Sequence, residues 1–144
     1  MADTHILAGV LLHHRKQLQL CDRLEAVADG LPNAVDRQEC LVLARDIYPS
    51  VKAAHEFEEE ELFPLVQKEY PLATQSDGFE RLQFEHWEDE AYAEEISDAL
   101  TQVGRTGQIG DAEKLSWMLR GFFEGIRRHI AFEAEHLVPL LKIN

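Results

Sequence analysis

Cysteine and basic residues are scarce in this chain, and long apolar runs are absent. The two cysteines, Cys21 and Cys40, lack CxxC spacing and do not indicate a disulfide framework. No apolar run approaches the length that spans a membrane, and no basic segment leads into an apolar signal core near Met1. These shortages argue against secreted and membrane classes, so we expect a cytoplasmic protein.

Acidic residues outnumber basic ones, with 27 Asp and Glu against 14 Lys and Arg, which gives a formal net charge of -13. Such a charge is repelled by nucleic acid and by anionic membrane surfaces, so neither is an expected partner. The total counts as negative any carboxylates that bind cations. A length of 144 residues with 45% hydrophobic content is enough for one core, so we expect a single domain over residues 1–144.

No stretch alternates polar and apolar residues with a period of two, so a β-sheet is not expected. Apolar residues instead recur at helical spacing in four stretches, which are separated by segments rich in glycine and proline. Four helices joined by short loops predict an all-α protein, an antiparallel up-down-up-down four-helix bundle. The predicted helices cover residues 4–29, 36–69, 79–103 and 114–141, the last with Asp111 as N-cap. Pro49 and Pro64 lie inside the second, so a kink or a broken start is expected there.

One motif occurs twice, in residues 55–65 and in residues 129–140. Each copy has His-x-x-x-Glu followed by Leu, an apolar residue, Pro and Leu, and the first copy reaches its proline one residue sooner. Residues four apart share a helix face, so His55 pairs with Glu59 and His129 with Glu133. His86 and Glu90 have the same spacing on the third helix.

The histidines of the four helices are expected to meet at one level of the bundle. Each stands roughly 15 to 19 residues from the loop that closes its helix pair, or roughly 22–28 Å at ~1.5 Å per residue. Four imidazoles with two or three carboxylates suit a pair of divalent cations. The candidate ligands are His14, His55, Glu59, His86, His129 and Glu133, with Glu90 as a lesser candidate.

Two choices within this set stay open. On the first helix His14 is preferred because apolar residues flank it at helical spacing, but His13 is the alternative. The acidic run from Glu56 to Glu61 covers more than one turn and cannot all face inward, so part of it is solvated and Glu58 has no assigned role. His5 and His136 are read as ordinary surface histidines, although His136 stands one turn beyond Glu133.

The order of these motifs over nearly the whole chain resembles the hemerythrin-like, or HHE cation-binding, domain family. The resemblance implies a non-haem di-iron centre with an oxo or hydroxo bridge, four terminal histidines, and Glu59 and Glu133 as bridging carboxylates. Glu56 matches an additional carboxylate ligand of some eukaryotic members. Imidazole and carboxylate ligands also accept manganese or zinc.

The sequence departs from the oxygen-carrying members of that family. Those have His-x-x-x-His on the third helix and His-x-x-x-x-Asp on the fourth. At the corresponding places this chain has His86-x-x-x-Glu90 and His129-x-x-x-Glu133. Four histidines and two glutamates are more similar to the bacterial proteins that repair iron–sulfur centres and respond to nitric oxide. The separate cysteine-containing segment of those proteins has no counterpart in this sequence.

The resemblance implies a small di-iron protein that binds or reacts with O2, NO or peroxide in sensing, storage or stress response. The alternatives are an enzyme with peroxidase-like, catalase-like or NO-reducing turnover, an iron donor for iron–sulfur repair, and a bundle without metal. A protein redox partner is compatible with the acidic surface. The sequence leaves open whether the chain is a monomer or a homodimer.

Overall fold

The computed structural model of the chain describes residues 2–75 and 77–142, and every regular element within these residues is a helix. The prediction of an all-α protein is therefore confirmed. Within the same residues no helix is both long enough and apolar enough to cross a membrane.

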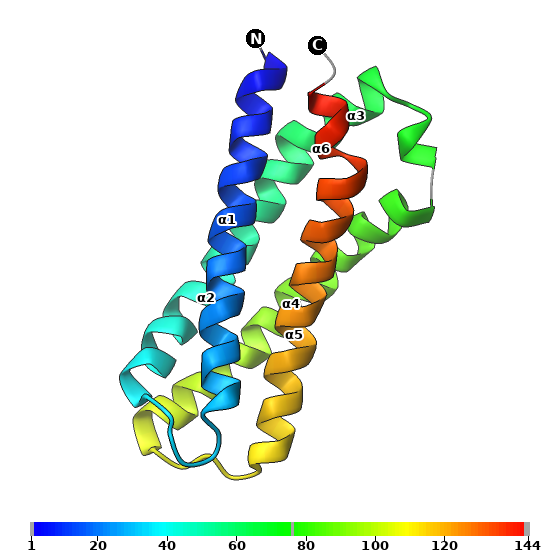
Figure 1. Cartoon of the computed structure of the whole chain (residues 1–144). Coiled ribbons are helices and arrows are strands. Elements are labelled where there is room, and N and C mark those ends of the chain that lie inside the picture. The colour runs from blue at the N-terminus through cyan, green and yellow to red at the C-terminus, as the bar shows by residue number, and fades with distance from the viewer. Residues whose placement is uncertain (1, 76, 143–144) are drawn as a thin grey trace.

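The long helical segments lie side by side, and each runs opposite to the one before it (Figure 1). Helix α1 packs against α5 and α2, while α4 packs against α2 and α5. This arrangement is consistent with the predicted antiparallel four-helix bundle. The elements in order are α1 (Ala2–Asp29), α2 (Arg37–Phe57), η1 (Glu58–Leu62), α3 (Phe63–Glu69), η2 (Ala73–Gln75), α4 (Asp77–Thr106), α5 (Ala112–His136) and α6 (Val138–Leu141).

Aspartate side chains begin two of these helices, as expected of N-caps. Asp36 Oδ1 accepts a hydrogen bond from the Glu39 amide at 3.1 Å, and Asp111 Oδ1 accepts one from the Lys114 amide at 3.0 Å. Each bond satisfies an amide that has no partner within its helix. The predicted N-cap at Asp111 is therefore confirmed.

Helix α4 is longer at its C-terminal end than the predicted helix, which stopped at Val103. Gly104 continues the helix because its missing side chain lets α2 approach, and a Cβ there would lie 2.5 Å from Leu41 side-chain atoms. The helix stops only at Gly107, whose φ of 73° is the left-handed conformation that favours glycine after a helix. Gly104 therefore allows α4 to pack closely on α2, and Gly107 ends the helix.

Proline interrupts the second segment, which comprises α2, η1 and α3, and the fourth, which comprises α5 and α6. The sequence predicts a proline break near the end of each. A proline ring clashes with the carbonyl four residues earlier, so the preceding turn must deform. Before Pro64 the deformation is the π-helical turn η1, in which the Phe63 amide bonds to the Glu58 carbonyl. Before Pro139 helix α5 ends at His136, and α6 begins after Leu137. Helix α2 continues through Pro49.

The apolar core consists of two clusters. The larger one lies towards the α1–α2 and α4–α5 loops and includes Leu24, Ile47, Leu100 and Phe123. The smaller one lies towards the other end and is built from α1, η1, α3, α4 and the end of the chain around α6. Each long segment crosses from one cluster to the other, and the buried polar residues lie at that crossing. Cys21 and Cys40 are both buried and free.

Candidate metal centre

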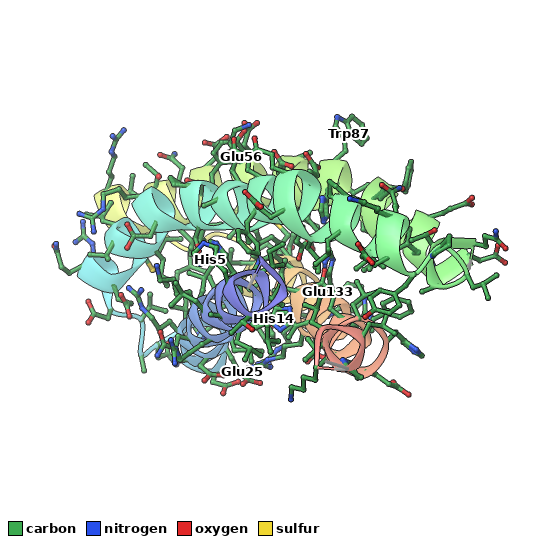
Figure 2. All side chains as sticks on the ribbon, turned by 90° about the horizontal axis from the view of Figure 1, so that it is seen from above. His5, His14, Glu25, Glu56, Trp87 and Glu133 are labelled. Atoms are coloured by element: carbon green, nitrogen blue, oxygen red, sulfur yellow. The ribbon has the colours of Figure 1, made fainter. Side chains whose placement is uncertain are left out.

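A layer of buried histidines and glutamates separates the two apolar clusters. Its members are no more than 7% exposed, although isolated buried charges are costly in a protein interior. Figure 2 shows two of them, His14 and Glu133, between the helices, while Glu25, Glu56 and Trp87 lie on the outside. The layer consists of His14, His55, Glu58, His86, His129 and Glu133.

Helix α1 contributes His14 to this layer and not His13. His14 Nε2 lies 2.7 Å from Glu133 Oε1, whereas the His13 ring packs against the Phe57 ring at a centroid distance of 5.1 Å. His14, which the sequence prefers over His13, is therefore the one that faces the other candidate ligands.

Glu133 lies at the centre of the layer and is fully buried, with 0% exposure. Its two oxygens have different histidine partners. Oε1 is 2.7 Å from His14 Nε2, and Oε2 is 2.7 Å from His129 Nε2. One carboxylate thus joins an imidazole from α1 to an imidazole from its own helix, which is the geometry of a bridging group.

Glu58, and not Glu59, is the carboxylate that the second segment contributes. Glu58 Oε2 lies 2.5 Å from His86 Nε2 and 3.4 Å from His129 Nε2. The side chain of Glu59 is 55% exposed, and its Oε1 approaches His86 from the outer side, 3.0 Å from Nδ1. The structure therefore places Glu58 in the buried layer and Glu59, the predicted bridging carboxylate, at its outer edge.

The proline that follows explains this difference of one residue. Glu58 begins the π-helical turn that precedes Pro64, and both Glu58 and Leu62 point inward from this turn. Counted backwards from the proline, Glu58 and Glu133 occupy the same position, because Leu, an apolar residue and Pro follow each at the same spacing. Alignment of the two copies on their prolines would have identified Glu58, whereas alignment on their histidines selects Glu59.

His55 and His86 lie against each other in the same layer. Their rings stack with centroids 3.9 Å apart and an interplanar angle of 7°. His55 Nδ1 lies 3.0 Å from Glu90 Oε2. The other ring nitrogen of His55, Nε2, therefore points away from Glu90. Glu90 and Glu59 thus hold the outer nitrogens of two histidines, an arrangement that fixes the orientation and tautomer of histidine ligands in metal sites.

The remaining predicted candidates lie outside the buried layer. Glu56, a lesser candidate, is exposed, and its nearest basic partner is Lys52 at 3.9 Å. Glu90 reaches Lys52 at 3.8 Å as well as His55, so it faces outward from the layer. His5 and His136 are exposed, in agreement with their interpretation as surface residues.

The layer contains two groups of three potential ligands that share one residue. Glu58, His86 and His129 form one group, and His14, Glu58 and Glu133 form the other, with the ligand atoms of each group within 4.8 Å of one another. A shared carboxylate between two donor groups is what a dinuclear site requires. Imidazole and carboxylate together suit iron, manganese or zinc.

Protonation links these side chains in the absence of a cation. Burial lowers the pKa of His129, but its hydrogen bonds to Glu133 and Glu58 outweigh burial and hold the pKa well above the usual value. Burial would raise the pKa of Glu133, whereas hydrogen bonds from His129 and His14 lower it. Burial and the charge of Glu133 raise the pKa of Glu58. Two carboxylates so close together therefore need positive charge beside them.

His55 differs from the other histidines of the layer. Burial, together with the neighbouring His86 and His129, lowers the pKa of His55 to about 2. Its imidazole is therefore neutral near pH 7, the form that binds a metal ion. Burial also lowers the pKa of His86, but hydrogen bonds to Glu58 and Glu59 reverse this and raise it.

Comparison with known families agrees with this geometry. Residues 5–141 match the family model of the hemerythrin HHE cation-binding domain. Searches of curated proteins and of solved structures give no match. The family match covers the four long segments and every residue of the buried layer. The chain therefore belongs to the hemerythrin HHE cation-binding domain family.

Proposed function

We propose that this chain holds two iron ions in the buried layer of an antiparallel four-helix bundle and binds or reacts with a small ligand such as O2, NO or peroxide. In this proposal the two carboxylates are shared between the ions and the imidazoles are terminal ligands. The proposed ligands are His14, His55, Glu58, His86, His129 and Glu133.

The observation that carries the proposal is the sharing of Glu58 between two buried donor groups. A single cation needs only one such group, and a bundle without metal needs neither. Glu133 supports the same interpretation, because its two oxygens contact a histidine of each group at 2.7 Å. Burying two carboxylates beside each other is costly unless cations or protons compensate them.

The side chains around the layer have separate tasks in this proposal. Glu90 and Glu59 accept hydrogen bonds from the outer nitrogens of His55 and His86, which keeps their inner nitrogens free for metal. Phe63 stacks on His86 with centroids 5.4 Å apart and, at 2% exposure, keeps water from that side. An iron pair, when bound, would supply electrons and an open position for a diatomic or peroxide ligand.

The ligand set also bears on the kind of di-iron protein. Four histidines and two glutamates support a relationship with iron–sulfur repair and nitric-oxide-responsive proteins rather than with oxygen carriers. We therefore propose that nitric oxide is bound in preference to reversible carriage of O2. A protein redox partner would return the iron pair to its reduced state.

Metal analysis combined with absorption spectroscopy tests the proposal. The full-length protein, expressed with iron and purified, should contain about two irons per chain and show the near-ultraviolet absorption of an oxidised iron pair. Reduced protein should change its spectrum with NO, and also with O2 but without recovery on removal of the gas. Protein that binds no iron under these conditions would refute the proposal.

A further inference from the structure

Two large aromatic side chains are exposed together on the outer side of α4. Trp87 is 72% exposed, and Phe84, one helical turn earlier, is 62% exposed. Residues three apart on a helix are neighbours on its surface, so the two rings form one apolar area. A partner that covers this area removes it from water, which is favourable.

Carboxylates lie around Trp87 on the side of α4 that faces α2 and η1. Glu94 is exposed and shares this side, because seven residues make nearly two helical turns. Glu56 projects from α2 on the same outer side of the molecule as Trp87 (Figure 2). The side chain of Glu59 in η1 is 55% exposed and contacts His86, the residue before Trp87. The area, here named the Trp87 surface, consists of Glu56, Glu59, Phe84, Trp87, Glu90 and Glu94.

The ion pairs of Lys52 show that the Trp87 surface accepts a cation. Lys52 Nζ lies 3.9 Å from Glu56 Oε1 and 3.8 Å from Glu90 Oε1. Glu59 and Glu94 have no Lys or Arg within 4.0 Å among the described residues, so the surface keeps an excess of negative charge. Trp rings also attract Lys and Arg side chains. The surface is therefore complementary to a basic protein face.

Hydrogen bonds connect the Trp87 surface to the buried layer. Glu59 Oε1 lies 3.0 Å from His86 Nδ1, and Glu90 Oε2 lies 3.0 Å from His55 Nδ1. Both histidines are candidate metal ligands, and Trp87 directly follows one of them. A protein docked on this surface is therefore separated from the proposed metal ions by one carboxylate and one imidazole.

We propose that the Trp87 surface docks a basic protein that carries one electron and that reduces the iron pair. Lys and Arg side chains of this carrier face the carboxylates, and an apolar part of it covers Trp87 and Phe84. Each docked carrier is oxidised by one electron and one ferric ion becomes ferrous, so two carriers reduce the pair. The electron transfer rests on the proposed function, whereas docking does not require metal.

Calorimetry of the full-length, purified protein with cytochrome c, a small basic one-electron carrier, tests docking. Saturable binding is expected. Trp87→Ala should weaken it at least about tenfold, as expected for an aromatic residue at the centre of an interface. Trp117→Ala is the matched control and should have no effect, because this tryptophan is 78% exposed but lies on α5.

A second pair of variants tests the charge of the Trp87 surface. Glu56→Lys should weaken binding of cytochrome c about tenfold at low ionic strength and less at high salt. Glu135→Lys makes the same change of charge on α5, where the side chain is 76% exposed, and should weaken binding no more than about twofold.

Electron exchange between cytochrome c and the iron-loaded chain tests the role of the docked protein. The oxidised chain is mixed with ferrous cytochrome c, and the reduced chain with ferric cytochrome c, so that both directions are measured. Exchange should involve two cytochromes per iron pair. Trp87→Ala should slow it at least about tenfold at low cytochrome concentration, and Trp117→Ala should not.

No binding of cytochrome c, or equal binding by Trp87→Ala and Trp117→Ala, would overturn the docking site. Binding without electron exchange in either direction would overturn the electron-carrying role of the partner. Failure of the metal proposal is distinguishable from both, because a chain that holds no iron can still bind cytochrome c at Trp87.

Discussion

The two copies of the repeated motif lie in residues 55–65 and residues 129–140. They are alike from the buried glutamate to the proline, and they differ in the spacing from the histidine to that glutamate. In both copies a glutamate is followed at the same spacing by Leu, an apolar residue, Pro and Leu. The histidine stands four residues before Glu133 but only three before Glu58. Both glutamates are buried in the polar layer, at 0% and 5% exposure.

The spacing between the glutamate and the proline therefore determines which carboxylate faces inward. Around the axis of an α-helix, the side chain at i+3 is rotated by ~60° from that at i, and the side chain at i+4 by ~40°. Both therefore point to roughly the same face as residue i. The histidine alone therefore cannot select between Glu58 and Glu59. The π-helical turn before Pro64 decides, because it directs Glu58 and Leu62 to the interior together.

The copies also differ at the outer face of their histidines. His55 Nδ1 has a carboxylate partner in Glu90, while His129 Nδ1 is buried and has none among the described residues. The outer nitrogen of the first copy's histidine is thus paired within the protein, whereas that of the second copy's histidine is buried without a partner among the described residues. Substitutions in each copy should therefore have unequal effects.

The largest effect is expected for Glu133, whose two oxygens contact histidines of both donor groups. Glu133→Ala should reduce the iron content to near zero, because both ions lose one of their two shared carboxylates. Metal analysis of the purified variant measures this. Glu135→Ala is the control, since that side chain is 76% exposed one turn away from Pro139. Retention of about two irons by Glu133→Ala would show that Glu133 is not a shared ligand.

A smaller and unequal effect is expected for the two prolines. Pro64→Ala permits a regular helix through residues 58–62, which would turn Glu58 away from the layer and weaken iron binding about tenfold. Pro139→Ala should change iron affinity less, because His129 and Glu133 precede the break in α5. Competition with a chelator measures both affinities. Equal losses in the two variants would contradict the role assigned to the π-helical turn.

The fold was largely predictable because its signals are local. Proline, glycine and aspartate mark the helix ends, and apolar spacing marks the buried faces, so the four segments were expected close to their actual bounds. The extension of α4 past Gly104 was not, because it depends on how closely α2 approaches.

The candidate site was predictable in its histidines but not in both carboxylates. His55, His86 and His129 stand at levels that helical rise alone brings together. Alignment on the histidines selects Glu59 because it does not take account of the π-helical turn that precedes Pro64. The apolar neighbours of His14 favour it over His13, and the contact of His13 with Phe57 agrees with that preference. The outer partners Glu59 and Glu90, and the unpaired nitrogen of His129, depend on side-chain packing between helices that no spacing rule contains.

The smallest expected effect concerns the contribution of Asp89, which lies near His129, to the stability of the protein. Burial raises the pKa of Asp89 from an ordinary 3.8 to about 6, so the folded state holds its proton more tightly than the unfolded state. The stability that this provides is complete below about pH 3.8 and is lost as the pH rises through about 6. Asp89→Asn should therefore stabilise the metal-free protein by about 1 kcal/mol at pH 7.5, after allowance for solvent screening.

Denaturant unfolding of the metal-free protein at several pH values checks this prediction. The gain from Asp89→Asn should shrink as the pH falls towards 4, and Glu88→Gln, at an exposed neighbouring site, should show no such trend. A gain that is independent of pH would mean that Asp89 is not destabilised by burial of its charge.

The iron content of Glu58→Ala and Glu59→Ala, determined side by side on purified full-length protein, tests the central claim most directly. If Glu58 is shared between two ions, Glu58→Ala should lose at least one of about two irons, while Glu59→Ala should retain both with weakened affinity. The opposite result, full iron in Glu58→Ala and loss in Glu59→Ala, would contradict the assignment of the bridging carboxylate.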